Sequence, residues 1–168
     1  GTSVMEDIHV HAGEVAVLAS GAGHAAWTNV SVVASIKGVS VQTPTSSLGN
    51  LDIELTSNEA VGIAVLGGQH DWSDIAVEKP FVSTDQSSVG LEAWYSDVSL
   101  DEFTSRNLST GMHLEDSNMA ARMAEANIGQ NVGVHLVDSN YIGEGLTTLA
   151  QDKGALIEGS STLQLASW

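Results

Sequence analysis

The sequence contains no cysteine among its 168 residues, which excludes a disulfide framework, a thiolate zinc site and a thiol nucleophile. Basic residues are scarce: five lysines and arginines stand against 21 acidic residues, a formal net charge of −16. Such a chain repels nucleic acid and anionic lipid headgroups, so we expect neither as a partner. Aromatic residues make up only 5% of the chain. No apolar run approaches the roughly 20 residues of a membrane span, so we expect no membrane insertion and a core of Val, Ile, Leu and Ala.

What the sequence does contain is a short internal repeat. Segments of the form acidic residue or Asn, aliphatic, any residue, aliphatic begin at Asp7, Asn29, Asp52, Asp74 and Asp97, spaced by 22, 23, 22 and 23 residues. A second series, in which glycine precedes an aliphatic alternation, begins at Gly38, Gly62, Gly90, Gly111, Gly133 and Gly154. Repeats of this length hold short strands and are too short for the helical ankyrin and tetratricopeptide repeats.

The two series predict an all-β protein, a single-stranded parallel β-helix (β-solenoid) of about seven coils with 21–24 residues per coil. Inward aliphatic side chains of successive coils then form columns with a spacing of about 4.8 Å. We expect one such column to contain Ile8, Val30, Ile53, Ile75 and Val98. Residues 1–168 are expected to form one domain, with residues 1–4 a flexible start or the remnant of a tag. Residues 118–127 have the composition of a helical turn.

One segment of the chain is repeated almost in full. Gly111 to Asn118 reads as glycine, strand, polar turn and Asn, and the same order returns from Gly133 to Asn140. With the 22- to 23-residue coil, this pattern resembles the right-handed parallel β-helix of the pectin-lyase-like superfamily over nearly the whole chain. The resemblance implies the architecture and says little of activity, since members include polysaccharide lyases, tailspikes and adhesins. The sequence lacks the superfamily's lyase and polygalacturonase signatures, so the resemblance implies a non-catalytic member without a resident cofactor.

Calcium is the one cofactor that the repeat itself suggests. Asp52, Asp74 and Asp97 would lie in one column at coil spacing, and clustered carboxylates bind Ca²⁺, which takes six to eight oxygen ligands. The alternative is that each side chain fixes the turn before its strand by bonding backbone amides.

A second candidate metal site involves histidine. His113 and His135 occupy the same place in successive coils, with Glu92 one coil earlier, all on the outward side of the strand. Imidazoles stacked beside a carboxylate could bind zinc or titrate as a pair. The alternative is that they are ordinary surface residues, because an in-line stack suits a tetrahedral metal poorly.

Aromatic side chains give a candidate glycan site. Trp27, Trp72 and Tyr95 each lie two residues before one of the first-series segments. In a regular coil they would form an exposed aromatic edge on which sugar rings could pack. The alternative is that they cover a corner of the coil and pack on one another.

These observations favour a non-enzymatic extracellular β-helix, a structural or adhesive domain of a surface, filament or virion protein. No capping helix precedes the first coil, so we expect the coil ends to stack on other copies of the chain or on neighbouring domains. The alternatives are a β-helix that binds or cleaves polysaccharide at the aromatic edge and a cation-dependent adhesin that uses the Asp column.

Overall fold

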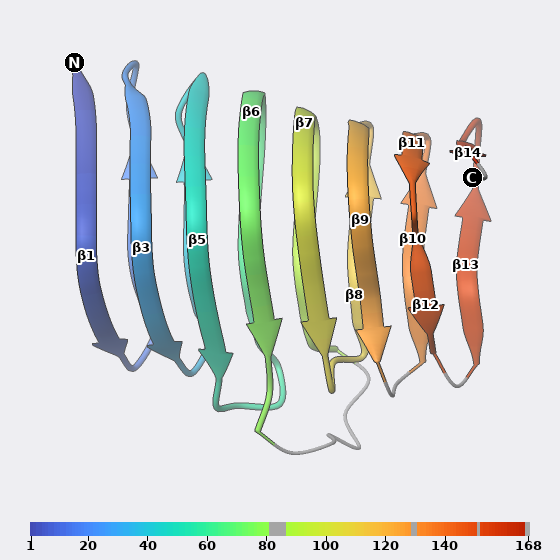
Figure 1. Cartoon of the computed structure of the whole chain (residues 1–168), viewed down its shortest axis with the longest axis horizontal. Helices are drawn as coiled ribbons and strands as arrows, with labels where there is room; N and C mark the ends of the chain where they lie inside the picture. Colours follow the sequence, from blue (N-terminus) through green and yellow to red (C-terminus); the bar gives the residue numbers. More distant parts are fainter. Residues whose placement is uncertain (81–86, 129–130, 151, 167–168) are drawn as a thin grey trace.

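The computed structural model describes residues 1–80, 87–128, 131–150 and 152–166, and these residues form a parallel β-solenoid. Strands pair with their equivalents one coil away, for example β1 with β3 and β8 with β10, and both pairings are parallel. The coils lie side by side from β1 at one end to β13 and β14 at the other, with the N and C labels at opposite ends (Figure 1). The described residues contain no helix, and the predicted all-β solenoid is confirmed.

Each coil combines a long strand with a short one. The long strands are β1 (Thr2–Ala12), β3 (His24–Ala34), β5 (Thr45–Leu55) and β9 (Asn118–Ile128). The short strands are β2 (Val15–Ser20), β4 (Lys37–Gln42), β8 (Thr110–Glu115), β10 (Val132–Val137) and β13 (Lys153–Glu158). Two strands, β6 (Val61–Glu78) and β7 (Val89–Arg106), run through both parts. The last coils contain β11 (Asn140–Glu144), β12 (Thr147–Leu149) and β14 (Thr162–Ala166).

The strand register defines the length of each coil. Equivalent positions in successive coils are Thr2, His24, Thr45, Gln69, Asp97, Asn118, Asn140 and Thr162. The chain therefore makes seven coils, as predicted, and six of them have the predicted length. The coil that begins at Gln69 is longer, at 28 residues, and includes residues 81–86, which lie outside the described part of the chain.

A residue in the left-handed backbone conformation divides each long strand. In the first five coils it is Asp7, Asn29, Asn50, Asp74 and Glu102, with φ between 50° and 59°. Asn and Asp tolerate this conformation better than most residues, because their short polar side chains bond locally. The left-handed residue shifts the alternation of side chains by one position, so that Trp27 and Val30 both point inward.

The predicted aliphatic column is only partly correct, because its register follows these left-handed residues. Ile8 does lie beside Val30, but Val30 lies beside Leu51, and the column continues through Ile75 to Phe103. The two remaining members are displaced: Ile53 pairs with Val32 and Val77, and Val98 pairs with His70. In two coils the residue before the inward member of this column, Leu51 or Phe103, is Asn50 or Glu102. The predicted Asp52 and Asp97 lie elsewhere.

The glycine series forms one continuous column along the short strands. A Cβ added to Gly38, Gly62, Gly90 or Gly133 would lie 2.5–2.7 Å from the carbonyl oxygen of the next glycine in the series. No real Cβ comes so close to an oxygen, so each of these positions requires glycine. The inward neighbours, such as Val39 and Leu91, are completely buried and supply the aliphatic core that the composition predicts.

Two local predictions need correction or comment. The predicted helical turn at residues 118–127 is wrong: this segment is part of strand β9, because it pairs with β7 on one side and with β11 and β12 on the other. Residues 2–4 pair with residues 24–26 as the start of β1, and whether residues 1–4 are the remnant of a tag stays a prediction. In the described part of the chain we find no helix of the length and hydropathy needed to cross a membrane.

Candidate functional site

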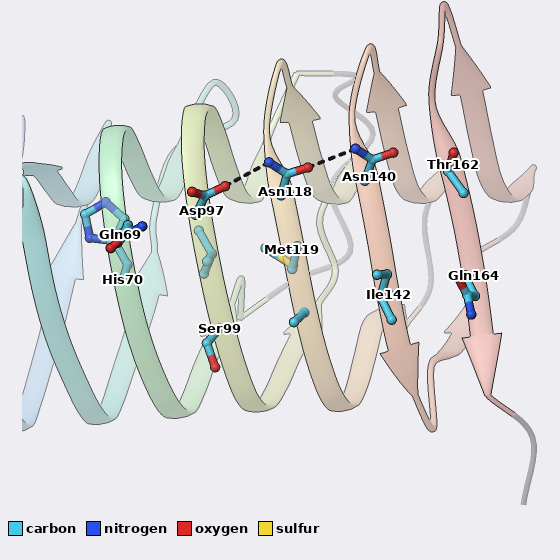
Figure 2. Close-up of a pocket in the computed structure, with 12 residues that line it drawn as sticks. Gln69, His70, Asp97, Ser99, Asn118, Met119, Asn140, Ile142, Thr162 and Gln164 are labelled. Carbon is cyan, nitrogen blue, oxygen red and sulfur yellow. Dashed lines mark hydrogen bonds between the residues drawn. The ribbon is translucent and has the colours of Figure 1, made fainter.

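A groove runs across several coils on the outer surface, parallel to the solenoid axis (Figure 2). Its volume is about 480 Å³, within the range of small-molecule and cofactor sites. One wall, which we call the amide row, consists of Gln69, Asp97, Asn118, Asn140 and Thr162. The facing row, two residues further along each strand, contains Ser99, Ala120, Ile142 and Gln164. We call the whole feature the axial groove.

Hydrogen bonds between coils fix the amide row. Asn118 donates from Nδ2 to Asp97 Oδ1 at 2.8 Å, and Asn140 donates from Nδ2 to Asn118 Oδ1 at 2.9 Å. All three side chains are exposed. Each bond uses one amide hydrogen, so the second hydrogen and further lone pairs stay available to a ligand. We call these three residues the groove ladder.

The facing row is less polar in its middle. Ala120 and Ile142 are both exposed, and Ile142 keeps 56% of its surface in contact with solvent. Between the two rows the inward side chains of Val98 and Met119 are buried, so the floor of the groove is the strand backbone. In β9 and β11 that backbone is already paired on both sides, because β9 lies between β7 and β11, and β11 between β9 and β14.

A buried polar network closes one end of the groove at His70. Ser46 Oγ lies 2.9 Å from His70 Nδ1, and His70 Nε2 lies 2.7 Å from the carbonyl oxygen of Gly67. Trp72 donates from Nε1 to Ser46 Oγ at 2.8 Å. These bonds are consistent with a neutral imidazole that donates from Nε2 and accepts from the Ser46 hydroxyl. Burial lowers the pKa of His70, opposed by its bond to Gly67 and by the charge of Asp97.

Ser46 and His70 do not have the geometry of a nucleophile and its base. Ser46 is 2% exposed and already accepts a hydrogen bond from Trp72, whereas a nucleophile must reach its substrate. The network instead satisfies polar groups that would be costly to bury alone.

The predicted column of Asp52, Asp74 and Asp97 does not form. Asp52 pairs with Ala76, Asp74 holds a left-handed position, and Asp97 pairs with Gln69 and Asn118. The prediction fails because the left-handed residues, rather than the Asp residues, keep a common register. Within the part of the chain that the structure describes, no three or more His, Cys, Asp or Glu side chains come together in a way that could hold a metal ion.

Asp74 faces a different carboxyl group, that of Glu102. A hydrogen bond between the two side chains, together with the charge of Asp74, raises the pKa of Glu102. Asp74 and Glu102 belong to the column of left-handed residues. This column begins with hydrogen bonds from Asn29 Nδ2 to Asp7 Oδ1 (2.9 Å) and from Asn50 Nδ2 to Asn29 Oδ1 (2.6 Å). We call Asp7, Asn29 and Asn50 the corner ladder.

The predicted alignment of Glu92, His113 and His135 is present. Glu92 pairs with His113, and the rings of His113 and His135 stack with centroids 4.7 Å apart and planes inclined by 9°. Burial and the neighbouring His135 lower the pKa of His113, whereas burial raises the pKa of Glu92. His135 Nε2 lies 2.7 Å from Glu158 Oε2. The structure thus shows an imidazole stack with one carboxylate partner, and metal binding there stays a prediction.

The predicted aromatic edge is wrong. Trp27 and Trp72 are 2% and 1% exposed and belong to inward columns, and only Tyr95 is on the surface. The prediction assumed that side chains alternate strictly between the inner and outer face of the strand, and the left-handed residue interrupts this alternation. Sequence reasoning also missed Asn118 and Asn140 as site residues, although their spacing of 22 residues is visible in the repeated segment.

Comparisons with known proteins add no relative: no family model, no curated protein and no solved structure matches this chain.

Proposed function

We propose that this chain is a non-enzymatic, rigid structural segment of an extracellular surface, filament or virion protein, and that its end coils stack on those of a second copy. The observation that carries the proposal is the exposure of inward side chains at both ends. Ile8 in the first coil is 39% exposed, whereas Val30 in the same column is 2% exposed. At the other end Leu165 on β14 is 51% exposed, whereas Ala121 in the same column is 7% exposed.

The first and the last long strand, β1 and β14, belong to the same columns. Leu165 ends the inward column that begins at Met5, and Ile157 ends the one that begins at Ala19. A second copy whose β1 pairs with β14 would continue the column of Met5 and Leu165 with parallel strands in register. Its contact would bury apolar side chains and pair the outer strand edges, the two terms that hold the internal coils together.

Polar side chains inside the solenoid also support a structural role. Ser96, Ser117 and Ser139 each donate a backbone N–H to the serine Oγ one coil further on, at 3.0–3.1 Å. These ladders lock neighbouring coils together instead of presenting reactive groups. The coil length and repeated Asn side chains support the further proposal that the chain is a distant, non-catalytic member of the pectin-lyase-like superfamily.

Sedimentation velocity over a wide range of protein concentration tests the stacking. We expect end-to-end oligomers that grow with concentration, and Leu165→Lys should weaken association at least tenfold, because it would bury a charge at the contact with β1 of the second copy. The matched control is Leu18→Lys, at an exposed outward position of the first coil. A protein that stays monomeric throughout, or equal loss in both variants, would contradict the proposal.

A further inference from the structure

We propose that His9 and His11 form a chelating site for a divalent transition metal ion on the outer face of β1, and that Cu²⁺ binds there more tightly than Ni²⁺ or Zn²⁺. The two imidazoles supply two ligands, and the other coordination positions are open to water. This inference goes beyond the structural role and does not depend on stacking of the ends.

The first strand places both histidines on one face. His9 and His11 are two residues apart in β1, and Val10 between them is partly buried and packs against the core. Side chains two residues apart on a strand share a face, with about 7 Å between their Cα atoms, which two imidazole rings can span. Both side chains are exposed, and β1 pairs with β3 at both positions. The backbone beneath the pair is therefore fixed, while the rings remain accessible.

The nitrogen atoms of the two rings already converge. His9 Nε2 and His11 Nε2 lie 2.8 Å apart. Since imidazole nitrogens bind a metal at about 2.0–2.1 Å, two of them lie roughly 2.9 Å apart at a right angle and roughly 3.4 Å apart at a tetrahedral angle. The observed separation fits the right angle. Cu²⁺ and Ni²⁺ favour square-planar or tetragonal sites, and Cu²⁺ binds more tightly than Ni²⁺ or Zn²⁺ to a given set of nitrogen ligands.

The histidine stack does not have this geometry. Ring centroids are 4.7 Å apart in both pairs, but the ring planes are inclined by 73° for His9 and His11 and by 9° for His113 and His135. A nitrogen lone pair lies in the plane of its ring, so two nearly parallel rings direct their lone pairs side by side and not at one point. His135 Nε2 also has Glu158 as a partner. The pair on β1 is therefore the stronger metal candidate.

Metal binding requires only a change of tautomer. The contact between the two rings needs a hydrogen on one of the two Nε2 atoms. A metal ion needs the lone pair of both atoms, so this hydrogen would move to Nδ1 of the same ring. Both imidazoles are then neutral, the form in which histidine binds metals, and the exchange releases no proton.

The charge of the surrounding surface favours a cation. The chain has a formal net charge of −16. In the columns of His9 and His11, Asp52 and Glu54 lie two coils further on, about 10 Å away, so they attract a cation without contacting it. In the part of the chain that the structure describes, no third His, Cys, Asp or Glu side chain completes the group. Water therefore fills the remaining positions.

Isothermal titration of the untagged chain with CuCl₂, NiCl₂ or ZnCl₂ provides the first measurement. We expect the tightest site to take one Cu²⁺ per chain and to bind Ni²⁺ and Zn²⁺ more weakly. Pulsed electron paramagnetic resonance of the Cu²⁺ complex counts the imidazoles bound to the ion, and the expected number is two. This spectroscopic count separates a histidine chelate from an ion held by carboxylates alone.

Variants locate the site. His9→Gln and His11→Gln should each weaken Cu²⁺ binding at least tenfold and reduce the imidazole count to one. The matched control is His24→Gln, which changes a histidine of the neighbouring coil that bonds Thr45 and should leave affinity and count unchanged. His135→Gln tests the histidine stack in the same way and should also leave both unchanged.

Three outcomes would overturn the inference. They are Cu²⁺ binding no tighter in the parent protein than in the double variant of His9 and His11, full affinity in both single variants, and a loss confined to His135→Gln. Circular dichroism of each variant shows that the solenoid is folded, so lost binding reports on the histidines. End-to-end association is measured separately by sedimentation, and its failure would leave this inference standing.

Discussion

Asparagine side chains stack in two places on the solenoid, and the backbone beneath them differs. In the corner ladder Asn29 and Asn50 have φ values of 55° and 50°. In the groove ladder Asn118 and Asn140 lie at the start of β9 and β11 in extended backbone. The side-chain bonds are alike, from an amide to the oxygen of the preceding coil at 2.6–2.9 Å.

The difference indicates which ladder the backbone conformation itself favours. At the corner, asparagine is favoured by the backbone conformation itself, since most other residues pay a penalty for a left-handed φ. In the groove the backbone would accept any strand residue, so the amides are not required by local conformation. An asparagine that local structure does not need is the better candidate for a ligand contact.

Substitution of one asparagine from each ladder should separate these roles most clearly. Asn50→Val places a β-branched side chain at a left-handed position and removes a hydrogen bond, so we expect it to lower the free energy of unfolding by about 2 kcal/mol. Asn118→Val loses only the hydrogen bond and gains strand propensity, so its cost should stay below about 1 kcal/mol. Urea unfolding monitored by circular dichroism measures both.

Glycine provides the control for the corner position. Asn50→Gly keeps the left-handed backbone at little cost and should recover most of the stability that Asn50→Val loses. If Asn50→Gly and Asn50→Val were equally destabilised, the hydrogen bond rather than the backbone would explain the corner ladder.

Acid should weaken the closed end of the groove before it affects the ladder beside it. Burial lowers the pKa of His70, so the folded protein binds fewer protons there than the unfolded chain. The contribution of the neutral His70 to the free energy of unfolding is therefore complete above the ordinary histidine pKa and is lost as the pH falls below it. A proton on Nδ1 would also break the bond from the Ser46 hydroxyl.

The test is the urea midpoint at mildly acidic and mildly alkaline pH. His70→Leu should reduce the loss of stability on acidification, whereas Gln42→Leu, at an exposed and non-titrating position of β4, should leave it as in the parent protein. An unchanged pH dependence in His70→Leu would show that protonation of His70 does not control this part of the fold.

The part of the fold that the sequence predicts well is the part governed by local sterics. The glycine series can be recognised in the sequence because a Cβ at four of its six positions would collide with the next coil, whatever the rest of the coil does. The register of the long strands cannot be predicted from the sequence in the same way. Both Asn50 and Asp52 fit the repeated pattern, and only the backbone shows that Asn50 is the left-handed residue.

The same cause explains the errors at the candidate sites. If side chains alternated strictly between the two faces of the strand, an inward Val30 would place Trp27 on the outside. The left-handed Asn29 puts two outward residues, Thr28 and Asn29, between them, so Trp27 also points inward. The histidine stack was predictable because no left-handed residue lies between Gly111 and His113 or between Gly133 and His135. The axial groove depends on which face five strands turn outward, and a spacing of 22 residues alone does not give that information.

The smallest expected effect concerns the carboxyl pair that continues the corner column. The hydrogen bond to Asp74 raises the pKa of the exposed Glu102, so the folded protein keeps a proton that the unfolded chain releases at lower pH. This contribution to stability is complete at acid pH and is lost as the pH rises through the raised pKa of Glu102. Glu102→Gln restores the amide–carboxylate contact of the corner ladder at every pH, so it should raise the urea midpoint slightly at neutral pH and remove this pH step. Glu78→Gln, at an exposed position of β6, should do neither, and equal effects in both variants would mean that only net charge had changed.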